Sequence, residues 1–441
     1  MGGQEQQQLW GKETTKAVAN FQISGERVPP AVIHWLGAIK AASARVNAEL
    51  GLLDEEVAER IAAAGDQVAA GELDDQFPID VFQTGSGTSS NMNANEVIAS
   101  VAGDTIHAND HVNMGQSSND VFPSAVHLAA LDQATNQLLP ALEQLEASFQ
   151  AKAEQFKDIV KAGRTHLMDA VPVTLGQEFA GYAAQIRLGA RRIRNALEQV
   201  AQIPLGGTAT GTGLNTHPEF AARVRARLTE ESELPVRPPE DPFEAQGSRD
   251  ALVELSGVLK VLAVSLTKIA NDLALMGSGP RAGIGELLLP ELQKGSSIMP
   301  GKVNPVIAEV VLQVSAQVIG NDTAVTVGGL EGAFELNVRI PLMARNLLQS
   351  ITLLSTAART FAEKCVDGID ANEEGCRRSA EMTLAAATAL NPHIGYDKGA
   401  EIVEEAARSG RPLREVALEM GVDEETYDKA MDLRKMAAGN L

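Results

Sequence analysis

The chain has 441 residues, a formal net charge of −21 and only 4% aromatic residues. This length allows a large core and by itself predicts two or three domains. The negative charge argues against nucleic acid or an anionic membrane as the main partner. It also means that a site for an anionic substrate must obtain positive potential locally, from lysine, backbone N–H groups or helix N-termini.

Cysteine and histidine usage restrict the cellular setting and the cofactors. Cys365 and Cys376 form no CxxC pair, which fits a reduced compartment such as the cytoplasm. The seven histidines show no clustered ligand spacing, so we expect no metal and no cofactor. The N-terminus lacks the features of a secretory signal, and no apolar run approaches the eighteen residues of a membrane span. We therefore expect a cytoplasmic protein.

The N-terminal part, residues 1–114, is predicted to be a mainly helical domain. Residues 1–24 are polar and are expected to be extended, held only by Leu9-Trp10-Gly11. Residues 29–71 predict two helices, and Asp54 is a suitable N-cap for the second because acidic residues follow it. Two polar strips, 83–93 and 111–120, come next, and each leads into a further helix.

Long heptad patterns dominate the middle of the chain. Leucine, isoleucine and methionine recur at alternating spacings of three and four between residues 252 and 276. Similar seams cover 175–200, 347–365, 307–318 and, with a gap at Thr135, 128–149. Such a repeat keeps one face of a helix against its neighbours. The sequence therefore predicts an all-α fold with an elongated five-helix bundle over residues 115–370.

A small helical domain is expected at residues 371–441. Its short helical patterns cover 372–390, 398–408 and 413–420, and glycine or proline separates them.

The segment 295–305, Gly-Ser-Ser-Ile-Met-Pro-Gly-Lys-Val-Asn-Pro, has the composition of a ligand-binding loop. Its glycines and serines provide flexible backbone, N–H donors and hydroxyls. Lys302 and Asn304 add a cation and an amide. Such a loop could lie over a small anion and place a serine beside its carbon.

His166 lies in a third polar segment, 163–169, and is the natural general acid or base because no other polar strip offers a better proton carrier near neutral pH. Glu309 is our candidate for the carboxylate that orients it. No GxSxG or P-loop motif is present. These residues favour proton abstraction beside a carboxylate, through an enediolate-like intermediate.

The chain resembles the class II fumarases of the fumarase/aspartase superfamily from Leu9 to its C-terminal part. The strings that carry the resemblance are Gly85-Ser86-Gly87-Thr88, Ser117-Ser118-Asn119-Asp120, Gly163-Arg164-Thr165-His166, Gly206-Gly207-Thr208-Ala209, Gly211-Thr212-Gly213-Leu214-Asn215 and the loop 295–305. The resemblance implies reversible hydration of fumarate to L-malate, a reaction of the tricarboxylic acid cycle. It also implies a homotetramer with a twenty-helix core, five helices from each chain, in which three subunits build each active site.

The resemblance further implies residue roles. Ser296 is then the base that takes the Cβ proton of malate, and His166 with Glu309 serves the departing or entering water. The residues expected to hold the substrate carboxylates and hydroxyl are Ser86, Thr88, Ser117, Ser118, Asn119, Thr165, Lys302 and Asn304.

Two other functions remain as alternatives. Aspartase shares the loop, but its pattern has Gln where this chain has His166, and its tendency to Ser-Thr differs from Ser117-Ser118. A non-catalytic structural protein on this scaffold should have lost Ser296, His166 or Lys302.

The segment 107–110 resembles the secondary anion site of the family. It contains His107, Asn109 and Asp110, but Ala108 replaces the usual proline and Asp104 stands where some members carry a basic residue. We expect this site to bind anions only weakly.

Overall fold

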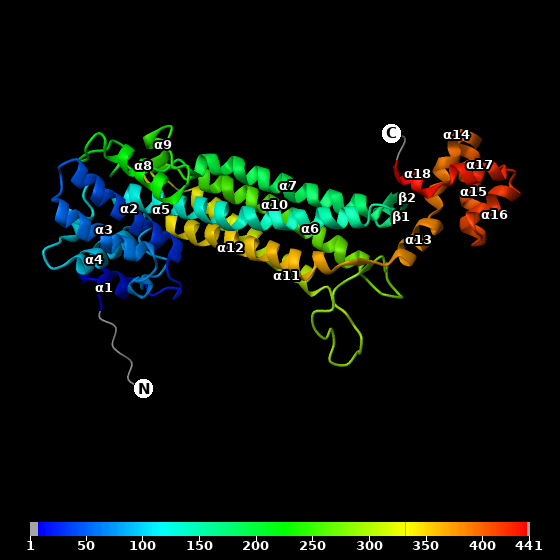
Figure 1. The fold of residues 1–441 in the computed structure, drawn as a ribbon, viewed down its shortest axis with the longest axis horizontal. Helices are drawn as coiled ribbons and strands as arrows, with labels where there is room; N and C mark the ends of the chain where they lie inside the picture. The colour runs from blue at the N-terminus through cyan, green and yellow to red at the C-terminus, as the bar shows by residue number, and fades with distance from the viewer. Residues whose placement is uncertain (1–7, 331, 439–441) are drawn as a thin grey trace. The chain divides into compact units, whose positions relative to one another are not determined.

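The computed structural model describes residues 8–330 and 332–438, and almost all of its regular structure is helical (Figure 1). Internal contacts divide the chain into two compact units. Unit 1 comprises residues 1–140, 189–263 and 314–355, and unit 2 comprises residues 141–188, 264–313 and 356–441. The predicted all-α fold is confirmed, whereas the division at residues 114 and 370 stays a prediction.

Unit 1 is organised around α2 (Pro30–Glu49), which packs against α3 (Glu55–Ala69), α5 (Ser118–Gln133) and α8 (Phe220–Ser232). Helix α4 (Thr88–Ala102) contacts α3 and α5, and α9 covers Pro242–Gly247. The predicted N-cap is confirmed, because the Asp54 carboxylate accepts the N–H groups of Glu56 and Val57.

Helix α1 (Lys12–Asn20) corrects the expectation of an extended N-terminal segment. Its first turn receives the Glu96 carboxylate of α4, which accepts the N–H groups of Gly11, Glu13 and Thr14. These N–H groups have no partner within the helix, so Glu96 supplies the cap that the local sequence lacks. The part of the prediction that concerns residues 1–7 lies outside the described residues.

The long helices are α6 (Leu139–Gln155), α7 (Leu175–Val200), α10 (Asp250–Met276), α11 (Val306–Gly329) and α12 (Ile340–Lys364). The predicted seams 175–200 and 252–276 match α7 and α10. Helix α11 continues beyond the seam 307–318, α12 begins before the seam 347–365, and the seam 128–149 is divided between α5 and α6. The apolar seam of α10 is buried from Leu252 to Met276. A π-helical turn, Ala134–Leu138, joins α5 to α6 where the heptad pattern has its gap at Thr135.

These helices pack together within each unit. In unit 1, Asp322 of α11 accepts from Ser256 Oγ of α10 at 2.8 Å, and Asn321 donates to Ser350 Oγ of α12 at 3.1 Å. In unit 2, the Phe149 ring of α6 packs against Tyr182 of α7 and Phe361 of α12. The five predicted seams therefore do form the helix-on-helix core.

Unit 2 contains two small antiparallel sheets that the sequence analysis missed. One is the hairpin of β1 (Val160–Thr165) and β2 (Met168–Thr174), and the other pairs β3 (Leu287–Leu288) with β4 (Asp370–Ala371).

The C-terminal residues form the predicted short helices and three more. The helices are α13 (Glu373–Met382), α14 (Asn391–Ile394), α15 (Tyr396–Ser409), α16 (Leu413–Glu419), α17 (Glu424–Ala430) and α18 (Leu433–Ala438), with a 3₁₀ segment at Leu384–Leu390. Leu390, Ile402, Val416 and Tyr427 share a small apolar cluster.

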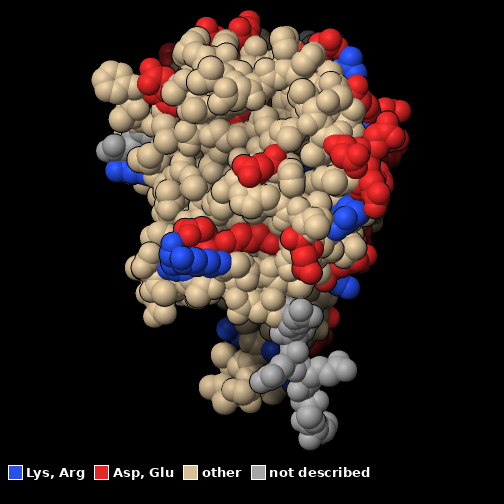
Figure 2. All heavy atoms as spheres, turned by 90° about the vertical axis from the view of Figure 1, so that its left-hand side faces the viewer, with Lys and Arg blue, Asp and Glu red and all other residues tan. Residues whose placement is uncertain are grey.

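The surface reflects the negative charge of the sequence. Figure 2 shows acidic side chains gathered along one edge of the face that it draws. Among the described helices, none combines the length and the apolar composition that a membrane crossing requires.

Candidate active site

The strip 83–93 forms a sharp turn into α4. Gly87 has φ 77°, and a Cβ there would lie 2.2 Å from the ring of Phe122, so only glycine fits. The turn places the hydroxyls of Ser86 and Thr88 2.8 Å apart at the helix N-terminus. This arrangement presents hydroxyl donors where the helix dipole favours an anion.

The strip 111–120 ends in a capping box at the start of α5. Asn119 N donates to Ser117 Oγ at 3.2 Å, and Ser117 N donates to Asp120 Oδ1 at 2.9 Å. The other oxygen of Asp120 accepts the N–H groups of Gly206 and Thr208. Burial raises the pKa of Asp120 to about 6, and these N–H donors oppose the rise.

The two strips meet through hydrogen bonds of the Asn91 amide, which donates to Asn113 Oδ1 and to Ser118 Oγ. Asn91 Nδ2, in α4, donates to Ser118 Oγ, in α5, at 3.0 Å. Asn119 Nδ2 donates to the carbonyl of Ala209 at 2.9 Å, which connects α5 to the glycine-rich segment 206–215. Unit 1 thus brings together the five expected residues Ser86, Thr88, Ser117, Ser118 and Asn119 on the ends of two adjoining helices.

His166 lies in the two-residue turn of the β1–β2 hairpin, not in an irregular loop. His166 and Leu167 have φ values of 58° and 61°, a left-handed pair typical of tight hairpin turns. Such turns usually contain Asn-Gly. His and Leu at these two positions have a strained backbone, which the rest of the structure must hold in place. Thr165 and His166 are exposed at the tip of this hairpin, in unit 2.

A buried ion cluster fixes the base of this hairpin. Arg164 makes a bidentate ion pair with Glu286, with both N–O distances 2.9 Å. Lys161 Nζ lies 3.1 Å from Glu286 and 2.8 Å from Glu178, and Ser379 Oγ donates to Glu286 at 2.7 Å. The Glu286 side chain is fully buried, so these partners compensate a charge that would otherwise be costly. The sequence indicated no role for the residues of this cluster, because its members are distant in sequence.

The loop 295–305 closes on itself without regular structure. Asn304 Nδ2 donates to the Gly295 carbonyl at 2.7 Å, and a Cβ on Gly295 would lie 1.8 Å from the Lys302 carbonyl oxygen. Ser296 Oγ accepts the N–H groups of Ile298 at 3.2 Å and Met299 at 3.0 Å. The loop therefore surrounds one serine oxygen with backbone donors and leaves Lys302 exposed.

His166 and Glu309 are both exposed in unit 2, and no hydrogen bond or ion pair joins them within the part of the chain that the structure describes. The pairing of these two residues stays a prediction. A reactive site normally excludes water, yet Thr165, His166, Lys302 and Glu309 are all exposed in this chain.

The secondary anion segment forms a π-helical turn, Ala108–Val112. His107 Nδ1 lies 2.9 Å from Asp110 Oδ2. The negative charge of this carboxylate beside the imidazole opposes the approach of an anion. Weak anion binding here therefore stays our prediction.

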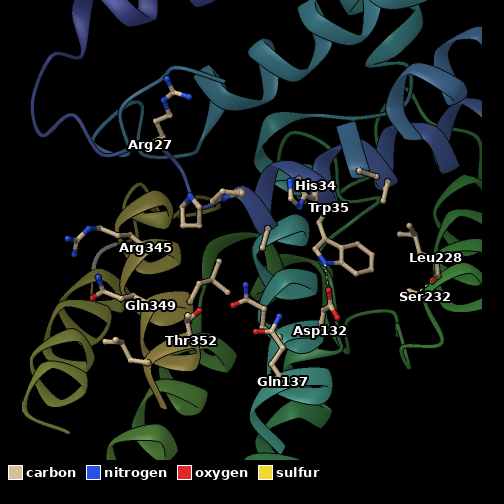
Figure 3. A pocket seen from close by; sticks show the side chains of 18 of the residues that line it. Arg27, His34, Trp35, Asp132, Gln137, Leu228, Ser232, Arg345, Gln349 and Thr352 are labelled. Atoms are coloured by element: carbon tan, nitrogen blue, oxygen red, sulfur yellow. Dashed lines mark hydrogen bonds between the residues drawn. The ribbon is translucent and has the colours of Figure 1, made fainter. Parts of the chain in front are cut away.

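A cavity of about 810 Å³ also lies in unit 1, and Trp35, Leu228 and Thr352 are among the residues that line it (Figure 3). Trp35 Nε1 donates to Asp132 Oδ2 at 3.3 Å on one side of it. Its lining contains none of the expected site residues. The cavity is thus separate from the candidate active site.

Comparison with known proteins gives a consistent result along the chain. The family profile described as "Lyase" matches residues 3–320, and that described as "Fumarase C C-terminus" matches residues 387–438. The chain is 53% identical to "Fumarate hydratase class II" of Corynebacterium glutamicum, over 97% of this chain and 93% of that protein. It is also 53% identical to the protein of the same name from Mycobacterium tuberculosis strain H37Rv, over 97% of this chain and 92% of that protein. Among solved structures, class II fumarase from Schistosoma mansoni superimposes with a TM-score of 0.97 at 36% identity, covering 100% of this chain and 97% of that one.

Proposed function

Because this chain belongs to the class II fumarate hydratase family, we propose that it catalyses the reversible hydration of fumarate to L-malate. The observation that carries the proposal is the 53% identity over 97% of the chain to a relative of that name. The chemistry of the candidate residues supports the same reaction, since they combine a serine oxygen that accepts two backbone N–H groups, a histidine, a lysine and clustered hydroxyls.

Ser296 is the base in this proposal. A serine hydroxyl is a poor base at neutral pH unless its oxyanion is stabilised. The N–H groups of Ile298 and Met299 point at Ser296 Oγ and provide that stabilisation. Lys302, in the same loop, adds positive charge as the Cβ proton of malate leaves. Ser297 receives no such donors among the described residues, which supports the choice between the two serines.

The remaining candidates bind the substrate and move the water. His166, oriented by Glu309, protonates the departing hydroxyl of malate or activates the entering water. Thr165, Asn304 and the hydroxyl strips of unit 1 hold the two carboxylates. Elimination is anti in this proposal, which requires the base and the acid to lie on opposite faces of the substrate.

We infer a homotetramer, in which three chains contribute to each site. Helix α11 supports this inference, because it exposes Val310, Ile319 and Val327 by 41%, 39% and 44% although its sequence is strongly apolar. Exposed apolar surface on a long helix is typical of a subunit interface. We also propose a cytoplasmic location, in line with the two unpaired, buried cysteines.

One assay tests the function. Purified chain, without added metal, is incubated with L-malate and the fumarate formed is followed by its ultraviolet absorbance. We expect rapid reversible conversion. L-Aspartate serves as the competing substrate, and faster release of ammonia from aspartate than of water from malate would replace this proposal by aspartase.

We expect His166 to contribute to the preference for malate over aspartate without determining this preference alone. His166→Gln introduces the residue of the aspartase pattern, and we expect hydration to fall strongly while ammonia release from aspartate stays inefficient. A single side chain rarely supplies the whole discrimination between two substrates. The two rates, measured on the same preparation, check this expectation. An efficient aspartase produced by this one change would contradict it.

A further inference from the structure

Lys40 is a fully buried cation beneath the hydroxyl strip of α5. It projects from α2, and its side chain has no exposed surface. A buried ammonium is costly unless polar groups compensate it. Lys40 Nζ donates to Asn113 Oδ1 at 3.3 Å and to Gln116 Oε1 at 3.2 Å. Both acceptors belong to the strip 111–120.

The hydrogen bonds of Lys40 fix the orientation of the Asn113 amide. Because an ammonium can only donate, the Asn113 oxygen must face it. The Asn113 Nδ2 group then donates to the Gln116 carbonyl at 3.1 Å. Asn113 Oδ1 also accepts from Asn91 Nδ2 at 3.2 Å. The orientation of one amide therefore determines that of the next.

The orientation of the Asn91 amide in turn fixes the hydrogen bonding of the Ser118 hydroxyl, a proposed substrate-binding group. Its Nδ2 group donates both to Asn113 Oδ1 and to Ser118 Oγ, the latter at 3.0 Å. Since Ser118 Oγ accepts this bond, its own hydrogen remains available to donate to another group. A substrate carboxylate can only accept, so a hydroxyl oriented as a donor is what its binding requires.

We propose that Lys40 is a positioning residue for substrate binding, which acts through Asn113 and Asn91 to hold Ser118 as a hydrogen-bond donor and supplies buried positive charge beneath the carboxylate site. The inference rests on the proposed function, because Ser118 is assigned to the substrate there. Lys40 itself does not contact the substrate.

The charge of Lys40 should respond to the substrate. Burial lowers the pKa of Lys40 to about 7, while the carboxylate of Asp120, the one charged group acting on it among the described residues, raises it. A bound dianion favours the ammonium form and raises this pKa again. Binding of fumarate should therefore weaken as pH rises from about 7, because the free protein then loses the Lys40 proton.

The test compares Lys40→Met, which keeps the length and removes the charge, with Lys40→Arg and with Lys152→Met. Lys152 is a matched control: it is buried, it donates to the Ile369 carbonyl, and it contacts no proposed site residue. We expect Lys40→Met to raise KM for fumarate about 10- to 100-fold, the usual effect of losing one charged hydrogen-bond donor, with a smaller change in kcat. The rise of KM with pH above 7 should disappear in Lys40→Met, while Lys40→Arg, which keeps a charge, should recover part of the affinity. Lys152→Met should keep the KM and pH profile of the parent.

If Lys40→Met does not fold, a double-mutant cycle on Asn91→Ala and Ser118→Ala tests the same series of hydrogen bonds. The proposal expects the two changes together to raise KM little more than either alone, because they interrupt one path. Additive effects would overturn it. An active parent whose KM and pH profile survive Lys40→Met would overturn the inference alone. A parent unable to hydrate fumarate would overturn the proposed function and this inference with it.

Discussion

Single side chains in this protein differ in function according to the backbone donors around them. Ser296 and Ser297 are neighbours with the same hydroxyl, yet only Ser296 Oγ accepts two backbone N–H groups among the described contacts. A hydroxyl so surrounded can carry developing negative charge, whereas its neighbour offers mainly its own N–H.

Ser296→Ala should therefore lose about 10²- to 10⁴-fold in kcat, the usual contribution of a positioned base. The affinity for a dicarboxylate inhibitor should change only modestly, because Lys302, Asn304 and the hydroxyl strips still hold the carboxylates. Ser297→Ala is the matched control and should be milder. Steady-state kinetics and inhibitor binding check both variants, and a larger loss in Ser297→Ala would move the base to that residue.

Asp80 provides a second residue-scale prediction, about stability. Burial alone would raise its pKa, but N–H groups of Phe82, Ser24 and Gly25 and the Ser24 hydroxyl lower the pKa to about 2. A lowered carboxyl pKa stabilises the folded state above the unfolded value, near pH 4, and this contribution is lost as pH falls toward 2. Asp80→Asn should lower the free energy of unfolding by about 2 kcal/mol at pH 7. The difference in stability between variant and parent should become smaller below pH 4. Thermal unfolding at several pH values measures this difference, and Asp75→Asn, a change at an exposed carboxylate, is the control. A stability difference that does not depend on pH would contradict the lowered pKa of Asp80.

At the scale of elements, two glycines allow the loop 295–305 to adopt its conformation. Gly295 lies so near the Lys302 carbonyl that a Cβ would be 1.8 Å from its oxygen, whereas Gly301, with φ 74°, has open space around its Cβ position. The two glycines of the same loop are thus needed for different reasons. Gly295 permits contact, and Gly301 permits a left-handed backbone.

Gly295→Ala should force the loop open and separate Ser296 from Lys302. A displacement of about 1 Å can cost about 100-fold in rate, so we expect at least that loss in kcat with little change in Tm, since the loop is largely exposed. Gly301→Ala should keep most activity, because its alanine meets only backbone strain of about 1 kcal/mol. Equal losses in both variants would show that loop flexibility, not the close contact, controls the rate.

At the scale of the molecule, the proposed site residues fall in two compact units and several of them are exposed. Thr88 and Ser118 belong to unit 1, and His166 and Ser296 belong to unit 2. A reactive site normally excludes water, and we propose that further chains complete it here, in line with the exposed apolar side chains of α11.

Complementation tests this directly. Ser296→Ala and His166→Asn should each be nearly inactive, but a mixed tetramer should regain activity, because some of its sites then take an intact Ser296 and an intact His166 from different chains. Co-expression with two purification tags isolates the mixed tetramer, and each variant assembled alone is the control. Full activity in a monomeric fraction, or none in mixed tetramers, would contradict assembly of the site from several chains.

The sequence by itself determined the long helices and the loop between them. Heptad spacing alone identified α10, α7, α12 and α11, since burying one apolar face is a local periodic requirement. The gap in the heptad pattern at Thr135 coincides with the π-helical turn Ala134–Leu138, but the pattern itself did not predict such a turn. The glycine, serine and proline content of 295–305 likewise excluded regular structure there. The motif strings were sufficient to indicate the family.

Only the tertiary structure decided the features that depend on distant partners. Helix α1 has no cap of its own and forms where Glu96 of α4 meets its N-terminus. The hairpin that carries His166 lacks the usual Asn-Gly turn, and it is held by the buried Arg164–Glu286 pair. The link from Lys40 through Asn113 and Asn91 to Ser118 joins α2, α4 and α5. No local pattern encodes such contacts, because each one exists only after the helices have packed.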